Sequence, residues 1–455
     1  MADSTLSGSS LVYVCLMSDY SLPNLEAIMA RQASDAVLIV TEYKPAIDAA
    51  ERMEEVLKNR LPSLRVHRPD REAGARPFEG DNPVEAQRWV GEVIAPYLER
   101  FKGQPCWLNM TGSTKALTLA MLVRLPWEGI DYKPAGKNEL LHFTLGPETS
   151  SPETPNPEHN ALARLGEADP ARTPLNDIAA TDVAQLYNTN VKPSTTRTDI
   201  FPAAERHALA EALFNALDER DPALVALFAL LNHVWCEHRD DIAFKAETVE
   251  LPMPEALHQD AILRKDQPRP DMPALQAWLA RFNTMAQAFH LDKQVITLPG
   301  NERGKLTKEV KALKKWLESD WLEQLVYHWV HQTEIPEHGI ALNIHAGEDP
   351  RNSSKQREAD LLIQHRSQTY VIEVKAAIPP GSDTRSIQTQ LASLKDHFGR
   401  ARLILFVGPA FKHQLSDTQW QAFVDRVEAG NGKVCCTRQE LLTALNLQPA
   451  LEPSV

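Results

Sequence analysis

The sequence lacks a hydrophobic run near the roughly 20 residues that a membrane-spanning helix needs. None of its five cysteines forms a CxxC pair, and their spacing shows no disulfide framework. The first residues also lack the basic flank that begins a signal peptide. These absences predict a cytoplasmic protein with no membrane part.

The sequence also has no excess of basic residues, since its formal net charge is −13. Such a balance argues at first against a nucleic-acid partner, whose phosphates prefer a basic surface. The deficit is uneven: residues 301–455 carry 19 basic and 19 acidic residues, whereas residues 1–300 carry 29 and 42. A neutral C-terminal part can still bind nucleic acid locally if its carboxylates hold a metal ion, since the ion adds positive charge.

Apolar residues make up 43% and charged residues 24% of the 455 positions, the balance of an ordinary globular protein of about two or three domains. Alternating strands and helices are predicted over 11–145. The apolar runs 11–17, 36–40 and 105–110 fit strands buried on both faces of a parallel sheet. This pattern indicates an α/β fold with a Rossmann-like, doubly wound sheet, which we assign to a domain at 1–150.

The next segment, 146–200, is rich in Pro, Ser, Thr and Glu and is interpreted as a linker. Residues 202–330 are predicted to be mostly helical, so 151–305 is assigned to a linker and helical region. From about 306 to 455 we expect a second α/β domain: an amphipathic helix at 308–332, three strands, and then further helices and strands.

Two polar positions interrupt apolar strands of this last domain. Twelve residues separate Asp360 from Glu373, and Lys375 follows two residues later. A hairpin with its turn near 365–368 would place both carboxylates on neighbouring strands, with Glu373 and Lys375 on one face. Converging carboxylates suit Mg²⁺ or Mn²⁺, and a nearby lysine suits an attacking water. An exposed Glu–Lys pair on an edge strand is the alternative.

A second group of polar residues follows the predicted strand at 105–110. The sequence Thr111-Gly112-Ser113-Thr114-Lys115 leads directly into a helix. Backbone N–H groups at a helix start favour an anion, and the hydroxyls and the lysine add donors and charge. The loop after the first strand contains Ser18, Asp19 and Asn24 and is expected at the same edge of the sheet. Neither GxxxxGK nor GxGxxG is present, and a simple helix cap remains the alternative.

Glu323, Asp360, Glu373 and Lys375 resemble the helix-Glu, Asp and ExK signature of PD-(D/E)xK nucleases, with Ala359 in place of the proline. The resemblance implies a restriction-endonuclease-like fold, catalytic roles for these four residues, and Mn²⁺ or Mg²⁺ held by Asp360 and Glu373. Glu358 is a further candidate for the metal or its surroundings. Glu323 also fits the polar side of an amphipathic helix.

A Rossmann-like domain with these loops, followed by such a nuclease domain, resembles the CRISPR ancillary nucleases that cyclic oligoadenylate activates. Their sensor is the CARF domain (CRISPR-associated Rossmann fold). The resemblance covers roughly 10–150 and 308–430. It implies a type III CRISPR defence endonuclease that cleaves DNA or RNA, and a homodimer that binds one ring across its twofold axis. Cyclic tetra-adenylate suits twofold symmetry, and cyclic hexa-adenylate stays open.

Two other functions remain open from the sequence. One is a constitutive repair or restriction-type nuclease, which would need no nucleotide. The other is a non-catalytic, nucleotide-responsive regulator, whose carboxylates would be structural. A HEPN ribonuclease is rejected, because Pro62 interrupts the segment between Arg60 and His67, and Arg281 lies too far from His290.

Overall fold

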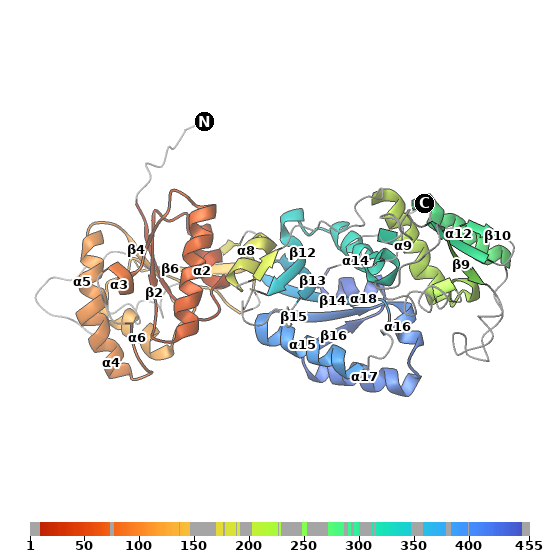
Figure 1. Cartoon of the computed structure of the whole chain (residues 1–455). Coiled ribbons are helices and arrows are strands. Elements are labelled where there is room, and N and C mark those ends of the chain that lie inside the picture. The colour runs from red at the N-terminus through yellow and green to blue at the C-terminus, as the bar shows by residue number, and fades with distance from the viewer. Residues whose placement is uncertain are drawn as a thin grey trace, which may run out of the picture.

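The computed structural model describes most of the chain, namely residues 10–72, 77–135, 137–145, 170–175, 178–187, 189–191, 203–225, 227–228, 248–252, 272–285, 290–292, 295–299, 312–313, 315–346, 358–378, 384–398 and 400–447. These residues form a mixed α/β structure with two large sheets and one small one (Figure 1).

The N-terminal sheet has seven strands in the order β3-β2-β1-β4-β5-β6-β7. The first five run parallel, and β6 and β7 are antiparallel to their neighbours. Their bounds are β1 Val12–Leu16, β2 Asp35–Ile39, β3 Arg65–His67, β4 Cys106–Asn109, β5 Gly129–Tyr132, β6 Glu139–Thr144 and β7 Ala171–Pro174. The strands predicted within 11–17, 36–40 and 105–110 are thereby confirmed.

Helices cover both faces of this sheet, which explains the uninterrupted apolar runs. Val12, Val14 and Leu16 of β1 face one core, and Tyr13 and Cys15 face another. On the Tyr13 side lie α1 (Leu22–Arg31) and α2 (Lys44–Arg60). On the opposite side lie α4 (Pro83–Trp89), α5 (Ala95–Leu98) and α6 (Lys115–Arg124). Every residue of β1 is therefore buried.

The C-terminal sheet has six strands in the order β16-β15-β14-β13-β12-β8. Their bounds are β8 Thr189–Val191, β12 Ile340–Ala346, β13 Glu358–His365, β14 Gln368–Lys375, β15 Arg402–Val407 and β16 Gly432–Cys435. Arg366 and Ser367 form the turn between β13 and β14 with φ of 47° and 61°. Two positive φ angles match the twist of a tight hairpin, and the turn predicted at 365–368 is confirmed.

Five described helices accompany this sheet: α14 Trp321–His331, α15 Thr384–Phe398, α16 Pro409–His413, α17 Asp417–Ala429 and α18 Arg438–Ala444. A π-helical turn, Trp316–Asp320, leads directly into α14. The predicted apolar stripe of this helix is confirmed where it is described, because Leu313, Trp316, Leu325 and Trp329 all lie in the core against the sheet. Val310 lies outside the described residues.

The middle of the chain differs from the mostly helical prediction. It contains α9 (Ala203–Asp218) and α12 (Met272–Met285), but also a three-stranded antiparallel sheet in the order β10-β11-β9. The strands are β9 Thr248–Pro252, β10 His290–Asp292 and β11 Val295–Pro299. The β-branched residues of β9 and β11 favour strands over helix. In Figure 1 this sheet and α12 lie at the right, beyond α14.

The strands also cross the predicted boundaries at 150 and 305. β7 joins the N-terminal sheet although it lies in the segment assigned to the linker, and β8 pairs with β12 of the C-terminal sheet. Between them lies α8 (Ala180–Leu186), which packs on α2, β12 and β13. Figure 1 shows α8 between the two large sheets.

One continuous core joins the two sheets across α8. It includes Tyr13 of β1, Val183 of α8, Leu362 of β13 and Leu394 of α15. Polar contacts reinforce it, since Arg60 at the end of α2 pairs with Asp182 at 2.7 Å. The N-terminal and C-terminal sheets are therefore packed together rather than joined only by a connecting segment.

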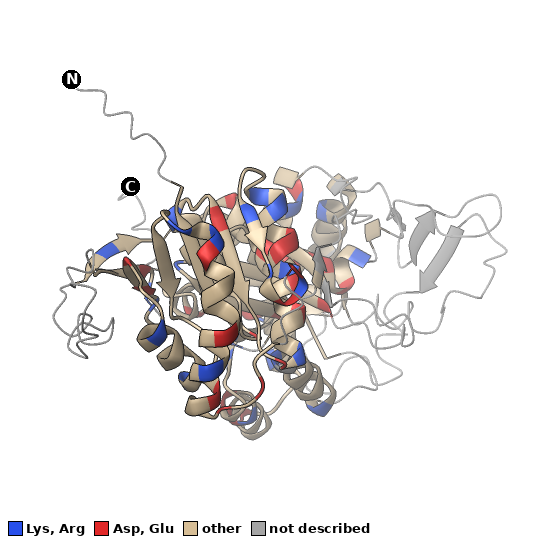
Figure 2. Cartoon of the chain, turned by 90° about the vertical axis from the view of Figure 1, so that its left-hand side faces the viewer, with Lys and Arg blue, Asp and Glu red and all other residues tan. Residues whose placement is uncertain are grey.

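Among the described helices none is long and apolar enough to cross a membrane. Cys15, Cys106, Cys435 and Cys436 are free thiols. Figure 2 shows Lys and Arg interspersed with Asp and Glu on the helices of the N-terminal part. Several of these charges form ion pairs, such as Arg71 with Glu51 at 2.6 Å.

Candidate functional site

Strand pairing brings the predicted nuclease residues together. Leu361 pairs with Ile372 and Leu362 with Val371, so the same register continued by one residue places Asp360 opposite Glu373. Glu373 and Lys375 share a face of β14 because side chains alternate along a strand. Glu373 lies in a central strand, flanked by β13 and β15, and its exposed fraction is only 2%. The structure therefore excludes an exposed pair on an edge strand.

Hydrogen bonds fix the orientation of both carboxylates. The backbone N–H of Val374 donates to Asp360 Oδ2 at 2.6 Å. Glu373 Oε1 accepts from Lys375 Nζ and from Gln390 Nε2 of α15, the latter at 2.6 Å. Glu373 Oε2 is buried and has no hydrogen-bond partner within the described part of the chain. Glu373 thus keeps one oxygen for a further cationic partner.

The start of α14 adds a third carboxylate to the group. Glu323 lies in the first turn of α14 and interacts electrostatically with Lys375, Glu373 and Asp320. Asp320 ends the π-helical turn, is buried, and has Lys315 Nζ at 3.6 Å from its Oδ2. π-Helical turns occur frequently at functional sites, and here the turn leads directly into the helix that carries Glu323.

Burial of several carboxylates near one another shifts their pKa values upward. Burial, reinforced by Asp320, raises the pKa of Glu323 to about 7. Burial and the neighbouring Glu373 and Glu323 raise the pKa of Asp360 well above its ordinary value. Burial works against the Lys375 ammonium, but Glu373 and Asp360 outweigh it and raise the lysine pKa. Perturbed groups of this kind cluster at functional sites.

A divalent cation would relieve this repulsion, and the residues fit one. No three His, Cys, Asp or Glu side chains are grouped as a metal cage among the described residues. Mg²⁺ and Mn²⁺ do not need such a cage, because they keep several waters and bind through one or two carboxylates. Asp360 and Glu373 supply two, and no described residue forms a hydrogen bond with the buried Glu373 Oε2.

Glu358, the third residue predicted at the metal, is the first residue of β13 and is exposed. It lies two positions before Asp360 and therefore on the same face of the strand. Its negative charge contributes to the raised pKa of Glu373. This placement suits an outer residue of the site better than a buried ligand.

Replacing the Glu323 carboxylate of α14 by a neutral amide is expected to stabilise the metal-free protein. The pKa of Glu323 is about 7 in the folded chain and about 4.3 when unfolded. The stabilisation that protonated Glu323 contributes to the folded state is therefore complete below the pKa of the unfolded chain. It is lost as the pH rises through about 7. A pKa difference of one corresponds to about 1.4 kcal/mol, so Glu323→Gln should raise the unfolding free energy at pH 8 by roughly 1–3 kcal/mol.

Thermal unfolding in a metal chelator from pH 5 to pH 8 measures this effect. The variant should show a flatter decline with pH than the unsubstituted protein. Glu337→Gln, which changes an exposed glutamate beyond α14, serves as the control and should leave the decline unchanged. A decline of equal steepness in Glu323→Gln would contradict a raised Glu323 pKa.

The second group of predicted residues lies where the N-terminal sheet reverses its winding. β1 pairs with β4, while the chain continues outward to β2 on one side and β5 on the other. Loops after the carboxyl ends of such neighbouring strands form the ligand site of doubly wound sheets. The loops that carry Ser18 and Thr111 therefore lie side by side.

Close backbone approach and two asparagines hold these loops together. A Cβ atom on Gly112, whose φ is 122°, would lie 2.6 Å from the Leu16 carbonyl oxygen, so only glycine fits. The Asn109 side chain donates to Asn24 Oδ1 at 2.8 Å, and the Asn24 side chain donates to the Leu16 oxygen at 3.0 Å. Asn24 is buried, so it positions the loops instead of presenting its amide to solvent.

The remaining predicted residues of the two loops form two groups: those that stabilise the loops by hydrogen bonds and those that could contact a ligand. Thr114 caps α6 by accepting from the Leu117 N–H at 3.3 Å, and Thr111 Oγ1 accepts from the Lys133 N–H at 2.9 Å. Ser113 has a φ of 63°, and its buried Oγ has no hydrogen-bond partner in the described structure. Lys115 and Asp19 are exposed.

Several residues of the two sites escaped the sequence reasoning. Asn109 could have been identified from the sequence, because it is a polar side chain at the end of the apolar strand β4. Gln390 and Asp320 carry no local signal, because each is one polar residue among many on a helix. Lys133 and Glu26 form a buried ion pair at 3.1 Å, and no sequence spacing joins them.

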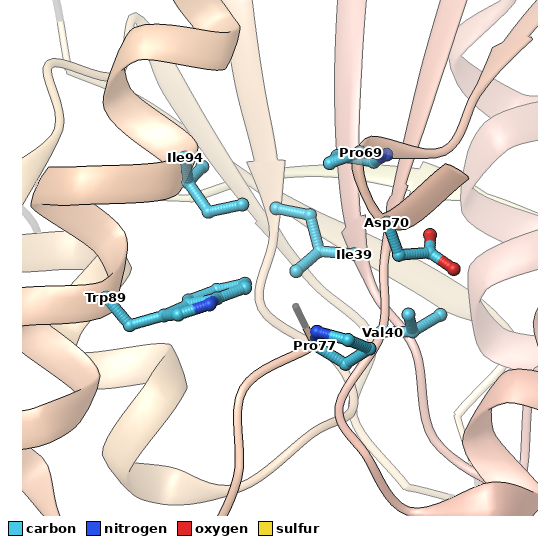
Figure 3. Close-up of a pocket in the computed structure, with 7 residues that line it drawn as sticks. All are labelled: Ile39, Val40, Pro69, Asp70, Pro77, Trp89 and Ile94. Carbon is cyan, nitrogen blue, oxygen red and sulfur yellow. The ribbon is translucent and has the colours of Figure 1, made fainter. Parts of the chain in front are cut away.

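The two cavities near these loops limit where a ligand can bind. Figure 3 shows a small pocket lined by Ile39, Val40, Pro69, Asp70, Pro77, Trp89 and Ile94. Its volume of about 10 Å³ holds at most one water. A larger groove of about 390 Å³ lies between the loop after β2 and Thr114. Glu42, Glu79 and Asp81 line it, so it disfavours phosphate compared with the loop at Ser113.

The fold is similar to two solved structures at 14% sequence identity. Protein VC1899 from Vibrio cholerae aligns with a TM-score of 0.62 over 96% of this chain and 97% of its own. Can2 from Sulfobacillus thermosulfidooxidans, solved in complex with cyclic tetra-adenylate, aligns with a TM-score of 0.57 over 96% and 98%. No protein-family model and no curated protein matches the sequence. What these comparisons establish is a shared fold that extends over almost the whole chain.

Proposed function

We propose that this chain is a metal-dependent endonuclease that cyclic oligoadenylate activates, acting in type III CRISPR antiviral defence on DNA or RNA. The observation that carries the proposal is the convergence of Asp360, Glu373, Lys375 and Glu323 in the C-terminal sheet and α14. Three neighbouring carboxylates with raised pKa values, Glu373 buried and Asp360 and Glu323 half-buried, are costly to maintain beside one lysine for stability alone.

The activator is inferred from the N-terminal sheet and from the fold likeness. Can2, which shares the fold, was solved with cyclic tetra-adenylate. Among the described residues the buried Ser113 hydroxyl has no hydrogen-bond partner, and Lys115 is exposed at the start of α6. These donors, together with the N-terminal end of α6, suit a phosphate of the ring.

In the proposed reaction Asp360 and Glu373 hold Mg²⁺ or Mn²⁺. When bound, the ion would stabilise negative charge on the phosphate and lower the pKa of a bound water. Lys375 is held by Glu373, so its ammonium is positioned to orient that water or to stabilise the phosphate. The Gln390 amide fixes the Glu373 carboxylate from α15.

We further propose that two copies bind one ring across a twofold axis. Leu119 and Val123 follow Lys115 at successive turns of α6, and their exposed fractions are 39% and 38%. This spacing places the three side chains on one face of the helix. A second copy packed on that face would cover the apolar side chains and bring two Lys115 ammonium groups toward one ring.

A single set of assays tests the proposed function. The full chain is incubated with Mn²⁺ or Mg²⁺, labelled DNA and RNA, and cyclic tetra-adenylate or cyclic hexa-adenylate. We expect cleavage only with metal and ring together, and a dimer mass in solution. Cleavage at full rate without a ring would identify a constitutive nuclease. Ring binding without metal-dependent cleavage would identify a non-catalytic regulator.

Lys115→Ala is expected to raise the ring concentration needed for activation. A charge-assisted contact to phosphate contributes roughly 1.5–3 kcal/mol, which corresponds to about a tenfold to 150-fold shift in the midpoint. A dimer makes two such contacts with one ring, so the shift can approach the square of that value. Saturating ring should restore most activity, because the catalytic carboxylates are unchanged.

Titration of cleavage against ring concentration measures the midpoint. Lys102→Ala removes an exposed lysine that precedes β4, at the opposite edge of the N-terminal sheet, and should leave the midpoint in place. If Lys115→Ala also leaves it in place, the loop at 111–115 is only a helix cap.

A further inference from the structure

The loop that carries the predicted ligand residues Ser18 and Asp19 also contacts the nuclease part of the chain. The guanidinium carbon of Arg400 lies 5.0 Å from the centre of the Tyr20 ring. Arg400 belongs to the turn between α15 and β15. The contact is a cation–π interaction between the sensor loop and the C-terminal end of α15.

A second aromatic contact holds the same end of α15. Tyr187, which lies between α8 and β8, packs edge-on against Phe398, with ring centres 5.6 Å apart and planes at 63°. Phe398 is the last residue of α15 and is buried in the core that joins the two sheets. The end of α15 is therefore held in the core that joins the two sheets.

Further along, α15 reaches the candidate nuclease site. Gln390 lies two turns before the end of the helix and donates to Glu373 Oε1 at 2.6 Å. Leu391 and Leu394 are buried on the same helix. Because a packed helix shifts as a unit by about 1–2 Å in switching proteins, a displacement near Arg400 would reach the Gln390 amide and the carboxylate that it holds.

Ser18 provides a way for a bound ligand to act on this contact. Its hydroxyl donates to the Tyr20 carbonyl oxygen at 3.0 Å. A serine hydroxyl has one hydrogen, so a ligand phosphate that accepts from Ser18 competes with that bond. Ligand binding would then alter the backbone at the residue whose ring meets Arg400.

We propose that Arg400 is a positioning residue of the nuclease, which transmits the state of the Ser18 loop through α15 and Gln390 to Glu373. The inference rests on the proposed function and specifies how the ring controls cleavage. Coupling of this kind requires that the ring bind more tightly to the conformation in which Glu373 is correctly placed. Removal of the contact should then separate ring binding from cleavage.

Arg400→Ala in the full chain tests this, with cyclic tetra-adenylate, Mn²⁺ and labelled DNA and RNA. We expect unchanged affinity for the ring and unchanged KM for the nucleic acid. The kcat at saturating ring should fall by about twofold to fivefold, the factor that a cation–π contact of an exposed arginine corresponds to. Tyr20→Leu removes the other partner and should give the same loss. The double variant should lose no more than either single one.

Arg402→Ala is the matched control. Arg402 is also exposed and lies two residues further on, but its guanidinium faces the Tyr370 ring at 6.0 Å instead of the sensor loop. It should behave as the unsubstituted protein.

Three outcomes would overturn the inference. If Arg400→Ala leaves kcat unchanged, the proposed coupling through Arg400 is refuted, and the proposed function stands. A higher KM with unchanged kcat would show that Arg400 binds the nucleic acid instead. An unsubstituted protein that cleaves equally with and without the ring would refute the proposed activation, and the coupling with it.

Discussion

Replacing Glu373 or Asp360 by alanine is expected to reduce cleavage to the level seen without added metal, while ring binding stays intact. The two carboxylates lie opposite each other on neighbouring strands, and Glu373 Oε2 has no hydrogen-bond partner among the described residues. Because Mg²⁺ and Mn²⁺ bind through few carboxylates, loss of one should leave the ion too weakly held for reaction. Cleavage assays with excess Mn²⁺ and calorimetric titration with cyclic tetra-adenylate measure the two properties separately.

The matched control for this pair is Glu428→Ala, which removes an exposed carboxylate of α17 that pairs with Lys433 at 2.6 Å. Its cleavage rate should equal that of the unsubstituted protein. Full activity of either Glu373→Ala or Asp360→Ala at excess metal would refute the assignment of the metal site.

Lys375→Ala is expected to lower kcat by roughly 10²–10³, the loss typical of a group that stabilises developing charge. Metal affinity should persist, because removal of a cation beside Asp360 and Glu373 takes away a competitor for their charge. Single-turnover cleavage and Mn²⁺ titration distinguish the two effects.

Lys412→Ala changes an exposed lysine on α16 and should leave both measurements unchanged. A fall in metal affinity that parallels the fall in rate would show that Lys375 maintains the structure of the site and does not act on the reacting groups.

The strands that carry the nuclease candidates were predictable because two independent patterns agree there. The apolar runs around Asp360 and Glu373 indicate strands, and twelve intervening residues fit a tight hairpin, which the turn at Arg366 and Ser367 confirms. Gln390 was not predictable, because its contact with Glu373 depends on how α15 packs across the sheet, and helical periodicity does not specify that packing.

The middle region shows more directly what hydrophobic periodicity cannot predict. Apolar helical spacing correctly predicts α9 and α12. The strands β9, β10 and β11 are only three to five residues long, and so short a segment cannot establish a period of two against helical neighbours. Likewise, the contribution of β7 and β8 to the two large sheets depends on partners distant in sequence, which composition does not reveal.

The position of α8 also determines where the chain can be divided in protein engineering. A fragment that begins at residue 306 would lose both α8 and β8. It would leave β12 as an unpaired edge strand and uncover Ile344, Ala359 and Leu362, which now belong to the shared core. Exposed edges and apolar faces of this kind favour aggregation. A soluble C-terminal fragment, or a chimera with another N-terminal domain, would therefore have to retain residues 178–191 together with the C-terminal sheet.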